Sequence, residues 1–426
     1  MIHLKQSFFN AQAKNNWALA FILLLTIISY MPTFFNGFQM GWDDQWMVMN
    51  AHTVGQFNGE RLRESFMKGI SGQYDPLNQL MYSLLYRIDG YNSMIYHAAS
   101  LLLHLCNTLS VYVLMRKILC DCTSLTPERI RWITFITTLF FAIHPLQVES
   151  IAWISASKIV LSTLFYLLAS MAFVRFLNTG CRMAYPITLL LFVLSYMCKE
   201  AVVCFPLWAT LLCVWYGLTP HMSRFWLYLI PLYIIALLMG LHLVFVVTSY
   251  NQYLRGDTYV WWERAVFCFY ALVTYIFKWM VPMNLSWMYQ YPAPRGEALP
   301  LWILPYPPLF CLVMYALWGW IKNRYVGSAL LFSLIHLLFV LHLTVLPRGA
   351  VIADRYMYLP LIGPSAIMAY ALTSPILIEK CRSAVVSGMA VLILLCVGLS
   401  YHRTKDWADS PTLKKVNKVI DNNSVN

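Results

Sequence analysis

The chain has 426 residues, of which 60% are hydrophobic and only 11% are charged. A soluble domain carries about twice that share of charge, so the composition excludes an ordinary soluble protein and indicates a polytopic membrane protein. The net charge of +12 does not point to nucleic acid, because Lys and Arg stand in short segments between apolar runs. The 11 cysteines lie mostly inside apolar runs and show neither a disulfide framework nor a zinc-ligand spacing.

Long apolar runs predict the membrane-spanning helices, since about 20 residues are needed to cross the hydrocarbon core. The first run lacks a small-residue cleavage site, which predicts a retained helix and not a signal peptide. The predicted fold class is therefore all-α, with about eleven transmembrane helices. The predicted spans are 17–35, 95–115, 131–144, 148–176, 184–198, 201–217, 225–248, 300–321, 328–346, 359–378 and 384–401.

A further apolar segment, 263–281, carries tryptophans and charges at both ends and is predicted to lie in the membrane interface. With that choice the basic residues between spans fall on one face, which the positive-inside rule makes cytoplasmic. These residues are Lys5, Lys14, Arg116, Lys117, Arg129, Arg131, Arg175, Arg182, Arg224, Lys322, Arg324, Lys380 and Arg382. The opposite face then holds two large outer loops, 36–94 and 249–299, with interfacial helices.

The first outer loop opens with Trp42-Asp43-Asp44. Adjacent carboxylates are costly close to lipid, so they indicate a functional site, although a solvated acidic loop is the plain alternative. His97 and His104 stand seven residues apart and therefore share one face of a helix. A lone His on an apolar helix is more often a satisfied core residue than a catalytic one.

Two further polar groups stand at breaks between apolar runs. His144 precedes Pro145, so its helix must end there and its ring can project into an outer pocket, with Glu149 at the start of the next helix. Lys199 and Glu200 interrupt two apolar runs where only a tight turn fits. They are either a structural ion pair that caps the turn or part of a ligand site.

Lys158 and the triplet Asp354-Arg355-Tyr356 complete the set, although a loop salt bridge would also explain the triplet. A carboxylate can take a proton from an acceptor hydroxyl, and Lys and Arg can hold a phosphate leaving group. A polyprenyl-phosphate sugar presents both chemistries at a membrane surface. The sequence has no Walker loop and no nucleotide-binding glycine fingerprint, which favours a lipid over a nucleotide sugar as donor.

Six groups of residues follow one another from about residue 30 to residue 405 in an order typical of one family. They are Asn36-Gly37-Phe38 to Trp42-Asp43-Asp44; Tyr96-His97 with Leu103-His104 and Asn107; His144-Pro145-Leu146 with Val148-Glu149; Trp153-Ile154-Ser155 with Lys158; Lys199-Glu200-Ala201; and Ala353-Asp354-Arg355-Tyr356 with Tyr358-Leu359-Pro360. Together they resemble the membrane half of the transmembrane and tetratricopeptide-repeat O-mannosyltransferases and their bacterial relatives, within the GT-C superfamily.

The resemblance implies a GT-C transmembrane domain over 1–401, a lipid-phosphate sugar donor and direct inversion at the anomeric carbon. It implies that Asp43 is the catalytic base and that Asp44 orients the acceptor or donor. Lys199, Arg355, Lys158 and His97 would bind the donor and its phosphate. The sugar and acceptor pocket would be lined by His144, Glu149, Glu200, Asp354, Tyr356 and Trp42. The sequence makes no cofactor certain and leaves a divalent cation (Mg or Mn) as an alternative, with His144, Glu149 and Asp44 as its ligands.

The chain also departs from the family pattern. Tyr74-Asp75-Pro76 stands where many relatives have Tyr-Arg-Pro, so an Arg that could bind phosphate is missing. Gln147 replaces the second His of the His144 turn, and Ile159 replaces an Asp. The tail 402–426 resembles the entry to the repeat region, but the repeats are lacking, so a protein acceptor would need another route or a separate acceptor-presenting partner.

The sequence thus predicts an integral-membrane glycosyltransferase that moves a sugar, with mannose as one candidate, from a polyprenyl phosphate to a protein or glycan hydroxyl. A lipid-linked oligosaccharide flippase would instead need polar groups at mid-membrane depth and internal repeats. A catalytically silent scaffold and an oligosaccharide polymerase or ligase are further alternatives. The expected location is a bacterial inner membrane with the site facing the periplasm, or the endoplasmic reticulum membrane with the site facing the lumen.

Overall fold

The computed structural model describes residues 17–50, 52–55, 59–68, 73–218, 220–250, 259–342 and 350–424. Over these ranges the chain is helical, and it contains no strand beyond one isolated bridge between Tyr289 and Ile352. The all-α class is therefore confirmed. Lys5 and Lys14, predicted to be cytoplasmic, lie outside the described residues.

Five helices are long and apolar enough to cross a membrane. They are Trp17–Phe35, α5 (Ser93–Cys122), Ile154–Thr179 with α8 (Ser157–Thr179), Arg224–Val246 within α11 (Ser223–Tyr250), and α17 (Pro375–Asp406). A bent pair, α6 (Pro127–Ile143) with Pro145–Ala152, would make a sixth span. The chain is thus an integral membrane protein by length and composition of its helices.

The other predicted spans correspond to shorter apolar helices. These are α9 (Ala184–Tyr196), η5 (Glu200–Cys204) with α10 (Phe205–Trp215), η7 (Leu301–Ile303) with α13 (Tyr306–Ala316), α15 (Arg324–Leu337) and α16 (Ile362–Leu372). Each predicted apolar run therefore coincides with a helix. The total of about eleven crossings stays a prediction, because these helices are only 10–17 residues long.

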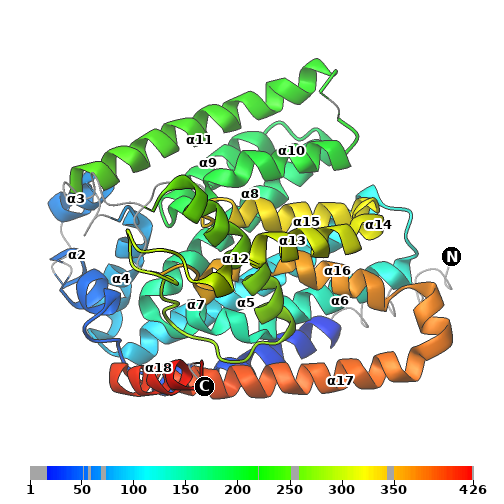
Figure 1. Ribbon diagram of the computed structural model, residues 1–426. Helices are drawn as coiled ribbons and strands as arrows, with labels where there is room; N and C mark the ends of the chain where they lie inside the picture. Colours follow the sequence, from blue (N-terminus) through cyan, green and yellow to red (C-terminus); the bar gives the residue numbers. More distant parts are fainter. Residues whose placement is uncertain are drawn as a thin grey trace.

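The helices form one elongated bundle (Figure 1). Within it α5 packs against α6 and α8, α8 packs against α9, and α16 packs against both α6 and α15. The contact between α15 and α16 depends on Gly363, because a Cβ there would collide with the carbonyl oxygen of Ala329 and the side chain of Ser333. Close approach of helices through a small residue is a usual way of packing them in a membrane.

The predicted break at His144 is confirmed. His144 has an extended backbone (φ −71°, ψ 137°), as expected for a residue before proline, and α6 ends at Ile143. Two short turns of 3₁₀ helix, η3 (Pro145–Gln147) and η4 (Ile154–Ala156), flank α7 (Val148–Ala152) before α8 begins. The chain therefore runs irregularly from residue 144 to residue 157, and its side chains there are buried except for Trp153, which is half-buried.

Both predicted outer loops contain helices. The first holds η2 (Gln45–Met49), α2 (His52–Gly55), α3 (Gly59–Lys68) and α4 (Pro76–Asp89), and the second holds α12 (Trp261–Met280). One face of α12 buries Phe267 and Tyr275, whereas Trp261 and Phe277 are exposed. This two-sided character is typical of an interfacial helix.

The tail is joined to the bundle and does not begin a separate unit at residue 402. Helix α17 continues to Asp406, and α18 (Ser410–Ser424) follows after a short turn. The side-chain amides of Asn36 and Gln39 donate to the carbonyl oxygens of Thr404 (2.9 Å) and Trp407 (2.8 Å). The tail therefore covers the first outer loop, at the end of the molecule where α4 and α18 lie (Figure 1).

Candidate functional site

Asp44 is a fully buried carboxylate that connects two loops. Its Oδ2 accepts the backbone N–H of Gln39 and its Oδ1 accepts that of Ser155, both at 2.8 Å. Burial raises the pKa of Asp44 to about 6; the hydrogen bonds from Ser155 and Gln39 oppose this rise, and the neighbouring charge of Asp43 adds to it. Because Asp44 is fully buried and both of its oxygens accept backbone N–H groups, it positions the loop that carries Asp43.

Asp43 has a different environment, although it is the next residue. Its side chain is half-buried and makes no hydrogen bond or ion pair with any residue that the structure describes. Its neighbours Trp42 and Asp44 contact Trp153 and Ser155, on the segment that leads to Lys158, and the Arg355 guanidinium lies over the Trp153 ring. A carboxylate with free lone pairs beside two cations can accept a proton from a hydroxyl group that binds between them.

A group of charged side chains, here called the lysine cluster, lies beside Asp43. It consists of Asp75, Lys158, Lys199 and Glu200, which interact electrostatically with one another. Lys158 Nζ donates to Oε1 of Gln73 and lies 4.0 Å from Asp75 Oδ2, and Lys199 Nζ lies 2.6 Å from Glu200 Oε1. The ion pair between Lys199 and Glu200, one of the two alternatives considered for this turn, is therefore present, and it is part of the lysine cluster.

Asp75 belongs to the lysine cluster, although the sequence did not predict it as a site residue. It was noted only as the residue in place of an Arg, but the structure buries it at the N-cap of α4, against Lys158. Burial raises the pKa of the Asp75 carboxyl, whereas the charges of Lys158 and Lys199 oppose the rise. Its position before Pro76, at the start of a helix, is the only sequence signal that could have indicated a structural role.

Arg355 is held in a fixed orientation by a second ion pair. Its guanidinium pairs with Glu149, and its backbone N–H donates to Glu149 Oε2 at 2.8 Å. The guanidinium also lies over the rings of Trp153 (5.2 Å) and Tyr356 (5.1 Å). Burial opposes the charged form of Arg355, but the charges of Glu149, Tyr356 and Asp43 outweigh it, so the pKa of Arg355 is raised and the cation persists at every physiological pH.

Asp354, predicted to line a sugar pocket, binds two other side chains of the protein in the structure. It is fully buried; its Oδ2 lies 2.6 Å from Nη2 of Arg403, and its Oδ1 accepts the hydroxyl of Tyr289 at 2.8 Å. Arg403 comes from the end of α17 and Tyr289 from the second outer loop. Asp354 therefore joins three distant segments beneath the site.

The two histidines named as site residues are both buried. His144 accepts the N–H of Leu146 through Nδ1 (3.2 Å), and its Nε2–H donates to the carbonyl oxygen of Trp279 (3.0 Å). His97 is fully buried against the backbone of Asn36 and Gly37. The ring nitrogens of His97 have no hydrogen-bond partner among the described residues, and the roles predicted for the two histidines stay predictions.

The predicted cation ligands do not converge. His144, Glu149 and Asp44 each use their donor atoms in the contacts above, and in the described ranges no three His, Cys, Asp or Glu side chains gather as a metal site would require. The residues present therefore do not fit a divalent cation held by the protein alone.

Tryptophans form one wall of the site. The ring of Trp42 stacks on Trp287 (centroids 3.9 Å apart, planes at 29°) and meets Trp153 edge-on at 6.5 Å. Trp153 in turn stacks on Trp407 at 5.8 Å. The buried indole N–H groups of Trp153, Trp287 and Trp407 have no hydrogen-bond partner among the described residues. Trp407 is fully buried and supports Trp153 from behind, whereas Trp42, Trp153 and Trp287 are partly exposed aromatic rings of the kind that can stack on a sugar.

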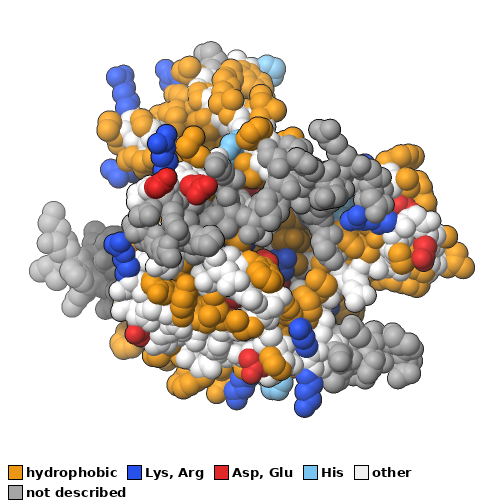
Figure 2. All heavy atoms as spheres, turned by 90° about the vertical axis from the view of Figure 1, so that its left-hand side faces the viewer, with side chains coloured by type: hydrophobic (Ala, Val, Ile, Leu, Met, Phe, Trp, Pro, Cys, Tyr) orange, Lys and Arg blue, Asp and Glu red, His pale blue; other side chains and the backbone are white. Residues whose placement is uncertain are grey.

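Figure 2 looks onto the end of the molecule where these residues lie, and acidic and basic side chains are visible in a recess near its centre. The recess is bordered by apolar surface. The arrangement combines an unpaired carboxylate, several cations and an aromatic wall at the edge of an integral membrane protein.

The fold and this site define an all-α integral membrane protein with a charged site at one end of its bundle. The chain is similar to "Protein O-mannosyl-transferase TMTC1" of Homo sapiens, with 32% identity over 148 residues. The protein of the same name from Mus musculus shows 33% identity over 150 residues. Each alignment covers 33% of this chain but only 16% and 15% of the relatives.

No protein-family model matches the chain. No solved structure matches it either. The similarity to the two curated proteins supports a GT-C-like relationship with the O-mannosyltransferases that the motifs resemble.

Proposed function

We propose that this protein is an inverting glycosyltransferase that moves a sugar from a polyprenyl phosphate to a hydroxyl acceptor, which is a protein or a glycan. The observation that carries the proposal is the position of Asp43, a carboxylate without a partner among the described residues. Its neighbours Trp42 and Asp44 contact Trp153 and Ser155, on the segment that leads to Lys158. The guanidinium of Arg355 lies over the same Trp153 ring. The similarity to proteins named O-mannosyl-transferases supports the reaction class and makes mannose the first sugar to test.

In the proposed reaction the acceptor oxygen attacks the anomeric carbon as the bond from that carbon to the phosphate oxygen breaks. Asp43 takes the hydroxyl proton, and the bonding electrons leave with the polyprenyl phosphate. Lys158 and Lys199 stabilise the charge that grows on the phosphate, because they lie in a partly buried cluster where a charge interacts strongly. The polyprenyl tail stays in the lipid beside the bundle.

The remaining residues hold this geometry. Glu149 orients Arg355 toward Asp43, and Asp44 fixes the loop that carries Asp43. Trp42 and Trp287 would stack against the sugar ring. Asp75 reduces the net positive charge beside Lys158, which favours release of the phosphate after transfer.

The proposal is tested by incubating the purified protein in nanodiscs with a panel of radiolabelled polyprenyl-phosphate monosaccharides and cell extract as acceptor. The expected result is release of polyprenyl phosphate from one donor, lost in Asp43→Asn and kept in Glu297→Gln, an exposed carboxylate of the second outer loop. Release from no donor would contradict the proposal and favour a flippase or a silent scaffold.

A further inference from the structure

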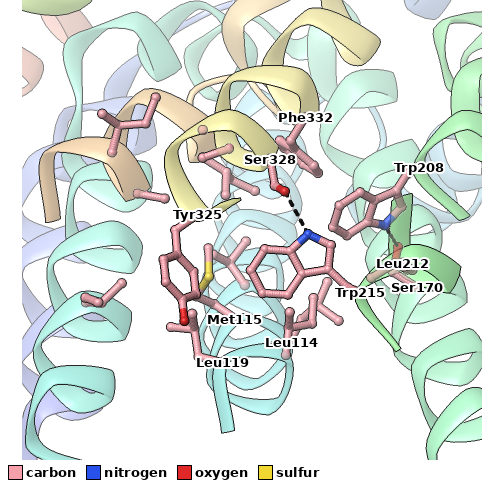
Figure 3. Close-up of a pocket in the computed structure, with 18 of the residues that line it drawn as sticks. Leu114, Met115, Leu119, Ser170, Trp208, Leu212, Trp215, Tyr325, Ser328 and Phe332 are labelled. Atoms are coloured by element: carbon pink, nitrogen blue, oxygen red, sulfur yellow. Dashed lines mark hydrogen bonds between the residues drawn. The ribbon is translucent and has the colours of Figure 1, made fainter. Parts of the chain in front are cut away.

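A second site lies away from the lysine cluster, inside the bundle. It is a partly open cavity of about 110 Å³ between α5, α8, α10, α15 and α16 (Figure 3). Its wall is formed almost entirely by apolar atoms, with Leu114, Trp208 and Phe332 among the residues that line it. An engineered apolar cavity of about 150 Å³ stays dry and binds benzene, so this volume suits a segment of hydrocarbon chain.

Most polar groups of the wall already have a hydrogen-bond partner in the protein. Trp215 Nε1–H donates to Ser328 Oγ (2.8 Å), and Trp208 Nε1–H donates to Ser170 Oγ (3.0 Å); Figure 3 shows the first of these bonds. The hydroxyl of Tyr166 hydrogen-bonds His336 at 2.6 Å. Because these groups already have hydrogen-bond partners in the protein, an occupant does not need to supply any, which favours an apolar chain over a sugar or water.

One end of the cavity is bordered by a row of aromatic rings between two arginines. Tyr325 packs against Trp215 (5.7 Å) and Tyr370 (5.2 Å), and all three rings line the cavity. The guanidinium of Arg324 lies 4.7 Å from the Trp215 ring, and that of Arg129 lies 4.3 Å from the Tyr370 ring. Aromatic rings and arginines at one level are typical of the boundary between lipid tails and headgroups.

Charge at this end is strongly positive. Arg116 and Lys117 lie near the end of α5, Arg131 near the start of α6, and Lys322 between α14 (Trp318–Ile321) and α15. The nearby carboxylate of Asp121 is already held by Lys117 (2.8 Å) and Tyr216 (2.7 Å). Basic pockets between transmembrane helices bind anionic lipid headgroups.

We infer that the cavity holds an acyl chain of an anionic glycerophospholipid whose headgroup phosphate lies between Arg129 and Arg324. Each arginine already donates to backbone carbonyl groups, Arg129 to Tyr370 and Arg324 to Val214 and Trp215, and therefore stands in a fixed place. The site is independent of the proposed sugar transfer, because its residues belong to the opposite ends of the helices.

The test uses the full chain in phosphatidylcholine nanodiscs that contain a trace of lipid with a photoreactive acyl chain. Two probes share that chain and differ only in headgroup, phosphatidylglycerol or phosphatidylcholine. After irradiation, mass spectrometry should find several-fold more labelling of 208–215 and 325–332 by the phosphatidylglycerol probe. The double variant Arg129→Gln/Arg324→Gln should lose this preference, whereas Arg382→Gln, a basic residue of α17, should keep it.

Variants that fill the cavity test whether it holds the acyl chain, independently of whether the arginines bind the headgroup. Ala329→Phe and, as a second variant in case the first does not fold, Ala366→Leu should reduce labelling of both segments by either probe. Equal labelling by the two probes in the unaltered protein would overturn the inference. So would displacement of the probe by polyprenyl phosphate at lower concentration than by phosphatidylglycerol.

Discussion

At the scale of single residues, the adjacent carboxylates Asp43 and Asp44 lie in opposite environments. Asp44 is buried and holds two backbone N–H groups, whereas Asp43 is half-buried and unpaired among the described residues. The sequence marks both as acidic, but nothing in it indicates that Ser155, 111 positions away, binds one of them. Which of two neighbouring carboxylates is free depends on tertiary contacts, and these are not encoded in a local pattern.

The buried Asp44 predicts a pH dependence of stability. Its pKa is raised from an ordinary value of 3.8 to about 6, so the folded protein binds this proton more tightly than the unfolded chain. Stability is therefore lost as pH rises from about 4 through 6, by about 3 kcal/mol as an upper order of magnitude. Thermal unfolding in detergent from pH 4 to 7 should show this fall in the unaltered protein and a flatter profile in Asp44→Asn. Parallel profiles would refute the assignment.

The ion pair of Asp354 and Arg403 predicts a large asymmetric effect on stability. Asp354→Ala should destabilise the protein by about 3–5 kcal/mol, because it leaves Arg403 buried without its counter-charge. The double variant Asp354→Ala/Arg403→Met should recover part of that loss. Asp121→Asn, which breaks the more exposed pair with Lys117, should cost less than about 1 kcal/mol. A similar loss in both single variants, measured by thermal unfolding, would show that burial of the pair does not matter.

At the scale of helices, the hydrophobic runs of the sequence predicted the apolar helices. Positions that face lipid and positions that face the bundle interior both need apolar side chains, so each such helix appears as an apolar run. Helix ends were predicted less well. Within the predicted run 359–378, α16 ends at Leu372 and α17 begins at Pro375, after the Ser374 cap. The predicted break between 378 and 384 is present as a kink at Cys381, whose backbone is not helical (φ −137°). The role of α17 in the site was also missed, because Arg403 and Trp407 lie in a tail interpreted as the start of another region.

The contact between α15 and α16 predicts opposite effects for two glycine substitutions. Gly363→Ala should destabilise the protein by about 1–3 kcal/mol, because the new methyl group meets the backbone of α15. Gly398→Ala, in the interior of α17 with open space around its Cα, should be neutral or stabilise by up to about 1 kcal/mol. The unfolding temperatures of both variants, measured in the same detergent, test this prediction. Equal loss in the two variants would mean that helix packing does not restrict Gly363.

At the scale of the whole molecule, the two ends of the bundle differ in chemistry. One end holds paired charges and tryptophans around Asp43, and the other carries an excess of basic side chains beside an apolar cavity. The charge pattern of the sequence indicated this division. It could not indicate the tryptophan wall, because Trp287 and Trp407 meet Trp42 and Trp153 only through the folded loop and tail.

This division predicts a topology that can be measured. Cys120 is exposed at the basic end and should react with a membrane-impermeant maleimide only from the cytoplasmic side. A cysteine introduced by Glu297→Cys, in a Cys120→Ser background, should react only from the opposite side. Mass spectrometry of the labelled peptides from right-side-out and inverted vesicles distinguishes the two. Labelling of both positions from the same side would contradict the proposed orientation.

The central claim is that Asp43 acts in the chemical step and does not merely support the fold. The most direct measurement determines donor binding and turnover on one preparation of Asp43→Asn, with the donor that the unaltered protein uses. We expect donor affinity within about twofold of the unaltered protein and turnover lower by about 10²–10⁴, the usual loss for a general base. Turnover that persists in a folded, donor-binding Asp43→Asn variant would contradict the account.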